Sequence, residues 1–162
     1  MKRTLVSGVA AVILATPALA IVQERQLSAD ERIETVEQWY ATRDYSMLAD
    51  ELDWRHAPGF FGGETLTTRA QVEEQLAPFY FEMFDNIAVK IEKVEASEQS
   101  VFSFGTYVFT PRNTDTIHRA PFIHVWTVDA DGKLDTLVQY ADTYLINRAL
   151  SDARVLTSPA RE

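Results

Sequence analysis

The sequence contains no cysteine among its 162 residues. This absence excludes disulfide bonds, thiolate catalysis, and zinc or iron–sulfur sites with cysteine ligands. The G-x-S-x-G nucleophile elbow, the phosphate-binding G-x-x-x-x-G-K loop and the H-E-x-x-H zinc motif are also missing. No cofactor fingerprint, internal repeat or interdomain linker is visible. We therefore expect one domain, without a cofactor, that is stabilised by core packing alone.

Basic residues are scarce as well, with 15 Lys and Arg against 24 Asp and Glu and a net charge of −9. An acidic surface repels phosphate backbones and anionic lipid. Nucleic acids and membrane surfaces are therefore not expected as partners. The apolar fraction, 46%, argues against a disordered chain.

The N-terminus has the pattern of a secretory signal peptide. Lys2 and Arg3 form a basic start, residues 5–14 are largely apolar, and residues 18–20 (ALA) match an A-x-A cleavage site. The apolar stretch is shorter than the ~20 residues of a spanning helix, although an uncleaved anchor is the alternative. The sequence thus predicts a signal peptide at 1–20, a single mature domain at 21–162 with its core at about 28–150, and a secreted or periplasmic protein without a stable membrane span.

Helices are expected in the first half of the mature chain. A capping box at Ser28 opens a helix to about Arg43, with Ile33, Val36 and Tyr40 in its buried stripe. Asp44 or Ser46 is expected to cap a shorter helix through Leu48 and Leu52. A second capping box at Thr68 opens a helix that Pro78 should kink or end.

Period-two alternation dominates from about residue 86. Strands are expected at about 87–92, 101–110, 117–128 and 134–144, joined by polar turns, with an earlier short strand at 53–57. Helices followed by an antiparallel meander indicate an α+β fold, with the helices on one side of the sheet.

The turn at 129–133 sets a register for the last hairpin. A three-residue loop with Gly132 in the left-handed conformation pairs residue 129 with 133. His124, Trp126, Tyr140 and Asp142 then share one face of the sheet. A two-residue turn would place His124 on the opposite face from Asp142.

Residues 121–126 (PFIHVW), 131–134 (DGKL) and 139–143 (QYADT) resemble the C-terminal half of SnoaL-like proteins. This family belongs to the nuclear transport factor 2-like superfamily, which includes ketosteroid isomerase and polyketide cyclases. The resemblance spans roughly 28–150 and rests mainly on the order of the segments. It implies a cone-like curved antiparallel sheet wrapped around N-terminal helices, with an apolar pocket at the wide end.

The resemblance also implies site residues. Asp142 matches the acid/base of related cyclases, His124 would polarise a carbonyl or hold Asp142 charged, and Tyr140 would donate to an oxyanion. His56 lies where the isomerases carry their general-base carboxylate, so steroid isomerisation would require this histidine as base. The residues expected to line core or pocket are Trp54, Phe79, Phe84, Tyr107, Phe122 and Trp126.

Each candidate also has a structural interpretation. Asp142 could cap the following turn, His124 could be a core histidine, and His56 could be a surface residue paired with an acid. No metal site is expected, because His118 and His124 lie ~20 Å apart on one strand at 3.3 Å per residue. The resulting hypothesis is a pocket for a small apolar carbonyl compound, with isomerase, cyclase or lyase chemistry. The alternatives are a carrier or sensor without catalysis, and an interaction domain that forms a homodimer through the outer sheet face.

Overall fold

The computed structural model describes residues 26–60 and 63–157, so the predicted signal peptide at 1–20 lies outside the described part. No helix within these residues is long and apolar enough to cross a membrane. The elements in chain order are α1 (Ala29–Thr42), the 3-10 turn η1 (Tyr45–Met47), β1 (Leu48–Arg55), β2 (Thr65–Thr68), α2 (Arg69–Gln71), the π-helical segment η2 (Val72–Leu76), α3 (Ala77–Met83), β3 (Phe84–Ala96), β4 (Val101–Pro111), β5 (His118–Val128), β6 (Leu134–Ala141) and α4 (Thr143–Thr157).

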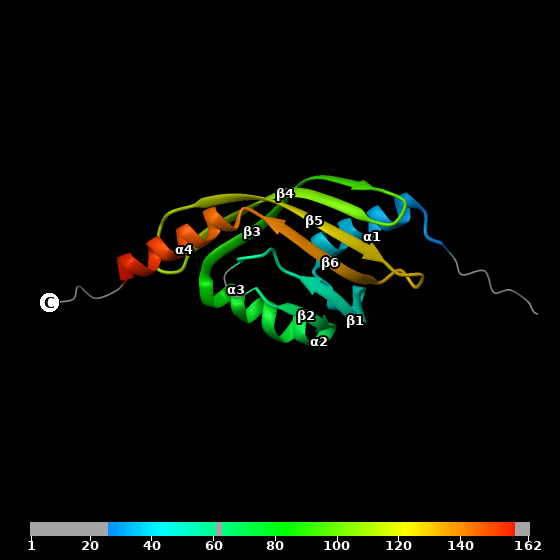
Figure 1. Cartoon of the computed structure of the whole chain (residues 1–162), viewed down its shortest axis with the longest axis horizontal. Helices are drawn as coiled ribbons and strands as arrows, with labels where there is room; N and C mark the ends of the chain where they lie inside the picture. The colour runs from blue at the N-terminus through cyan, green and yellow to red at the C-terminus, as the bar shows by residue number, and fades with distance from the viewer. Residues whose placement is uncertain (1–25, 61–62, 158–162) are drawn as a thin grey trace, which may run out of the picture.

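The six strands form one curved sheet in the order β2-β1-β6-β5-β4-β3 (Figure 1). Strands β3 to β6 form the expected antiparallel meander, but the last strand ends at Ala141 instead of residue 144, because α4 begins at Thr143. Strand β1 extends the sheet by pairing in parallel with β6, and β2 pairs with β1. The α+β class and the curved sheet with N-terminal helices are therefore confirmed.

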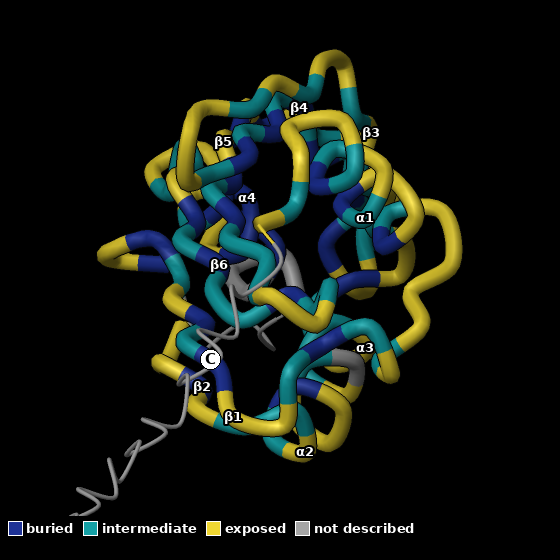
Figure 2. The backbone as a smooth tube through the Cα atoms, turned by 90° about the vertical axis from the view of Figure 1, so that its right-hand side faces the viewer, coloured by how far each residue is buried: buried dark blue, intermediate teal, exposed yellow. Residues whose placement is uncertain are grey.

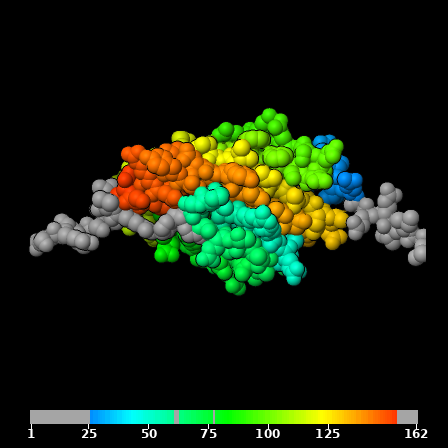
Figure 3. Space-filling model, viewed as in Figure 1, coloured from blue at the N-terminus to red at the C-terminus, as the bar shows by residue number. Residues whose placement is uncertain are grey.

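Helix α1 packs against β3, β4 and β5. In β4 every second residue is buried, from Val101 to Pro111, and in β5 the buried positions include Ala120, Phe122, His124 and Trp126. This alternation places one face of each strand on the core. Figure 2 shows the buried segments along these strands and the exposed ones at the turns. In Figure 3, β1, β2 and α2 cover the surface next to β6.

Helix α1 begins where its capping box predicts. The Ser28 hydroxyl accepts a hydrogen bond from the Glu31 amide, and the Glu31 carboxylate accepts one from the Ser28 amide. The expected helix through Leu48 and Leu52 is wrong, because Asp44 caps only the short turn η1 and Leu48 already starts β1. Parallel pairing with β6 stabilises residues 48–55 as a strand, and local helix signals do not reveal such a long-range contact.

The second capping box is confirmed at Thr68. The Thr68 hydroxyl accepts a hydrogen bond from the Gln71 amide, and the Gln71 side-chain oxygen accepts one from the Thr68 amide. Pro78 does not end this helical region, which continues to Met83 as α3. Instead, the wider turns of η2 directly precede α3. Proline lacks an amide hydrogen and crowds the preceding turn, so a local widening lets the chain remain helical.

The predicted turn at 129–133 is present, but the predicted register is wrong. The Asp129 amide donates to the Lys133 carbonyl at 2.8 Å, and Gly132 adopts a φ of +80°. A bulge then follows between the Val128–Leu134 and Thr127–Thr136 pairs. It inserts Asp135 as an extra residue, which shifts all later pairs by one position.

Candidate functional site

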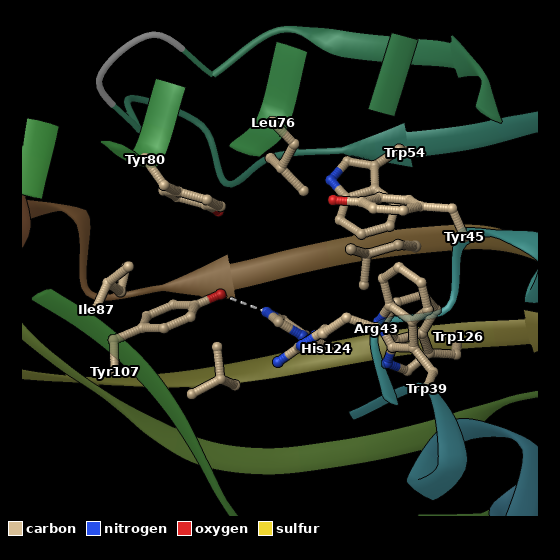
Figure 4. Close-up of a pocket in the computed structure, with 12 residues that line it drawn as sticks. Trp39, Arg43, Tyr45, Trp54, Leu76, Tyr80, Ile87, Tyr107, His124 and Trp126 are labelled. Atoms are coloured by element: carbon tan, nitrogen blue, oxygen red, sulfur yellow. Dashed lines mark hydrogen bonds between the residues drawn. The ribbon is translucent and has the colours of Figure 1, made fainter. Parts of the chain in front are cut away.

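A cavity of about 340 Å³ lies between the end of α1, the segment η2 and the concave face of the sheet (Figure 4). Its volume is in the range of small-molecule sites. Its walls are mainly aromatic and aliphatic. The lining residues are Trp39, Arg43, Tyr45, Trp54, Leu76, Tyr80, Ile87, Val89, Tyr107, His124, Trp126 and Leu137.

All three tryptophans of the chain line this cavity. Their rings meet edge to face, with centroid distances of 6.2 Å for Trp39–Trp54, 6.2 Å for Trp39–Trp126 and 5.6 Å for Trp54–Trp126. Edge-to-face packing of large rings holds each one in place. One wall of the cavity is therefore rigid and apolar, and tryptophan fluorescence reports on the cavity alone.

The polar part of the cavity is built around His124, which is 6% exposed. Its Nδ1 lies 2.7 Å from the Tyr40 hydroxyl, and its Nε2 lies 2.5 Å from the Tyr107 hydroxyl. Trp126 donates from Nε1 to the Tyr40 oxygen at 2.9 Å, and Gln139 donates from Nε2 to the Tyr107 oxygen at 2.8 Å. Strands β4, β5 and β6 supply four of these side chains, and α1 supplies Tyr40.

Burial fixes the protonation states in this network. It lowers the pKa of His124 to about 3, and the nearby positive charge of Arg43 adds to the lowering. Burial raises the pKa of Tyr40 to about 12 and that of Tyr107 well above its usual 10.0. At neutral pH the imidazole is therefore uncharged, and both phenols keep their protons.

A neutral imidazole donates from one nitrogen and accepts at the other. The Ala57 amide donates to Gln139 Oε1 at 3.0 Å, which orients the Gln139 amide so that its nitrogen faces Tyr107. With the His124 proton on Nε2, the Tyr107 oxygen accepts from both His124 and Gln139. The Tyr107 proton is then free to be donated to a molecule in the cavity.

Among the described residues that line this cavity, Arg43 alone is charged at neutral pH. It follows α1 with a φ of 53°, and its amide donates to the Trp39 carbonyl at 2.9 Å. Its Cζ lies 5.0 Å from the ring centroid of Tyr40 and 5.7 Å from that of Trp39. The residue as a whole is exposed, but burial of its guanidinium lowers its pKa. Its charged group therefore turns inward over the aromatic rings.

Of the expected catalytic residues, only His124 lines this cavity. The bulge places Tyr140 opposite Ile123 on the outer face, where it is 55% exposed. Asp142 lies at the start of α4, where its Oδ1 accepts from the Leu145 amide at 3.0 Å. Tyr140 and Asp142 therefore do not share a face of the sheet with His124, and their expected roles depended on such a shared face.

His56 lies in a neighbouring cavity of about 140 Å³, which shares Leu76 with the first. Its Nδ1 is 2.6 Å from the Glu64 carbonyl oxygen, so this nitrogen carries the proton and donates. Its ring stacks on Phe60 at 5.6 Å, and burial lowers its pKa. His56 is consequently neutral, with the lone pair of Nε2 available.

Of the six residues expected to line core or pocket, Trp54, Tyr107 and Trp126 line the main cavity. Phe79 lines the cavity of His56, and Phe84 belongs to the core beside it. Phe122 lies behind the polar network, with its ring centroid 4.4 Å from that of Tyr107 and 4.3 Å from that of His124.

Sequence reasoning missed Tyr40, Arg43 and Gln139 as parts of the site. Tyr40 and Arg43 lie at the end of α1, and only the packing of α1 on the sheet brings them to His124. The expected register pairs His124 with residue 138, whereas the structure pairs it with Gln139. No group of three or more potential metal ligands occurs in residues 26–60 and 63–157.

No protein-family model matches the sequence, and no curated protein is significantly similar to it. Solved structures do match. A nuclear transport factor 2-like protein from Burkholderia thailandensis is 22% identical over 76% of this chain and 98% of its own, with a TM-score of 0.67. TerC, co-crystallised with polyporic acid, is 24% identical over 75% of this chain and 98% of its own, with a TM-score of 0.66.

A SnoaL-like polyketide cyclase candidate from Jannaschia sp. CCS1 covers more of the chain. It is 14% identical over 85% of this chain and 99% of its own, with a TM-score of 0.64. At these identities the similarity defines the fold. The expected nuclear transport factor 2-like fold, with SnoaL-like proteins among its structural neighbours, is therefore confirmed.

Proposed function

We propose that this chain, which has the nuclear transport factor 2-like fold, binds a small, largely apolar carbonyl compound in the cavity of His124. The observation that carries the proposal is the Tyr107 hydroxyl, which accepts from Gln139 and contacts His124 inside an otherwise apolar cavity. The tryptophan wall would hold the hydrocarbon part of the ligand. The Tyr107 hydroxyl would donate a hydrogen bond to the carbonyl oxygen of the ligand.

The network makes Tyr107 an effective donor. With the His124 proton on Nε2, the Tyr107 oxygen accepts two hydrogen bonds, which stabilise negative charge on it, so its proton bonds more strongly to an acceptor in the cavity. His124 and Gln139 are thus positioning residues for Tyr107. The co-crystallisation of TerC with polyporic acid supports the proposal in that a protein of this fold binds a small molecule.

Cyclohexyl methyl ketone is a suitable probe, and the intrinsic tryptophan fluorescence is the readout. We expect Tyr107→Phe to weaken binding about tenfold, the effect of losing one good hydrogen bond in a dry site. Tyr140→Phe is the matched control, because Tyr140 lies on the outer face. Equal affinities of wild type and Tyr107→Phe for the ketone would refute the assigned role of Tyr107.

A second candidate function is cofactor-free proton transfer, as in isomerases and cyclases. His56 favours it, because its Nδ1 is fixed by the Glu64 carbonyl and its Nε2 is an unprotonated base next to the main cavity. His56 would take a proton from the carbon next to the carbonyl, and Tyr107 would stabilise the enolate oxygen. Returning the proton to the same or another carbon completes the exchange or isomerisation.

Deuterium exchange into the ketone, followed by proton NMR in D₂O, separates the two functions. A catalyst accelerates exchange, and His56→Gln removes the acceleration while binding persists. A carrier or sensor binds the ketone without accelerating exchange.

Export through a signal peptide at 1–20 is part of the proposal, supported by the sequence pattern of those residues.

A further inference from the structure

We propose that the ligand of the cavity carries a carboxylate, which pairs with the guanidinium of Arg43. This inference rests on the proposed function and specifies its ligand class, a small apolar monocarboxylic acid. Arg43 would hold the carboxylate, Tyr107 the carbonyl oxygen of the proposed function, and the tryptophan wall the hydrocarbon part.

Arg43 gives the cavity a positive charge. Among residues 26–60 and 63–157, no Asp or Glu lines the cavity, so the charge of Arg43 has no counter-ion among these lining residues. Its described contacts are the ring faces of Trp39 and Tyr40. A guanidinium that is partly removed from water binds a carboxylate strongly, because two parallel charge-assisted hydrogen bonds form.

Arg43 lies next to the His124 network. The Tyr40 ring lies under the guanidinium, with its centroid 5.0 Å from Cζ, and stacks on the His124 ring at a centroid distance of 6.1 Å. Tyr107 follows, bonded to the far nitrogen of His124. The Arg43 guanidinium and the Tyr107 hydroxyl therefore belong to the same polar wall of the cavity, as Figure 4 shows.

Arg43 is the residue at which helix α1 ends. A φ of 53° is the left-handed conformation that non-glycine residues rarely adopt. The hydrogen bond from the Arg43 amide to the Trp39 carbonyl ends α1 in this conformation. The side chain is thereby turned back over Trp39 and Tyr40, which places the cation at the cavity.

The test compares two probes that differ in charge. 3-Cyclohexylpropanoate and 3-cyclohexylpropanamide share their hydrocarbon part, and neither absorbs where tryptophan is excited. We expect the wild type to bind the acid at least about tenfold more tightly than the amide at neutral pH and moderate salt. The net charge of −9 would repel any anion, so such a preference requires a local cation.

Arg43→Gln should abolish the preference while the amide still binds, which shows that the cavity is intact. Arg43→Lys should restore part of it. Arg119→Gln is the control, since Arg119 is an exposed residue of β5 and its loss changes the net charge equally.

Equal binding of acid and amide by the wild type would overturn the inference and leave the proposed function standing. The same holds if Arg43→Gln weakens both probes equally, which would assign Arg43 a structural role. Absence of binding of the acid, the amide and the ketone would overturn both.

Discussion

Stability should depend on pH through His124. This side chain is buried as a neutral ring with a pKa of about 3, against 6.5 in an unfolded chain. Between these two values the unfolded state binds one proton more than the folded state. The contribution of His124 to the free energy of unfolding is therefore fully present above pH 6.5, and it is lost progressively as the pH falls towards 3.

The size of this contribution follows from the two pKa values. One differential proton changes the free energy of unfolding by about 1.4 kcal/mol per pH unit. Between pH 7.5 and pH 5, His124 alone should therefore remove about 2 kcal/mol. The lowered pKa of His56 acts in the same direction, so the wild-type curve alone does not isolate His124.

A comparison with His124→Gln isolates it, because glutamine does not titrate and all other groups are shared. Urea unfolding followed by circular dichroism should be measured for both proteins at several pH values. We expect the difference in free energy between them to shrink by about 2 kcal/mol from pH 7.5 to pH 5. If the two free energies of unfolding changed in parallel with pH, folding would not lower the pKa of His124, which would contradict this prediction.

Gly105→Ala should lower the free energy of unfolding by about 1–3 kcal/mol, because the added Cβ would lie 2.3 Å from the Lys90 carbonyl oxygen and 2.6 Å from Phe122 Cζ. A melting temperature equal to that of the wild type would contradict the close packing of β3, β4 and β5. Asp142→Ala should cost about 1 kcal/mol, because the Leu145 amide loses its acceptor. Hydrogen exchange should then accelerate at the start of α4, whereas unchanged exchange would rule out this cap. The alternative of an interaction domain that forms a homodimer predicts a species of twice the monomer mass in sedimentation velocity, and a monomer at all concentrations would contradict it.

Local signals in the sequence predicted the elements that depend on local contacts. Ser28 and Thr68 carry their capping boxes within three residues, so both helix starts were predictable. The turn at 129–133 was predictable for the same reason. The expected short strand at 53–57 covers only the end of β1, and residues 48–52 were not predicted as strand, since β1 is stabilised by its pairing with β6, far away in the chain.

The site was predicted only in part, and the bulge at Asp135 explains most of the difference. The shift by one residue brings Gln139 to His124 and sends Tyr140 to the outer face. Asp135 accepts a hydrogen bond from the Thr127 hydroxyl across the bulge. No turn rule predicts such a contact. The position of Arg43 over the cavity depends on the packing of α1 and carries no local signal.

The proposed function depends on a hydrogen bond that Tyr107 donates to the oxygen of a molecule in the cavity. The carbonyl stretching frequency of bound, ¹³C-labelled cyclohexyl methyl ketone reports on this bond. We expect a lower frequency in the wild type than in Tyr107→Phe, because a hydrogen bond weakens the carbonyl bond. The same frequency in both proteins, with the ketone bound to each, would contradict the claim.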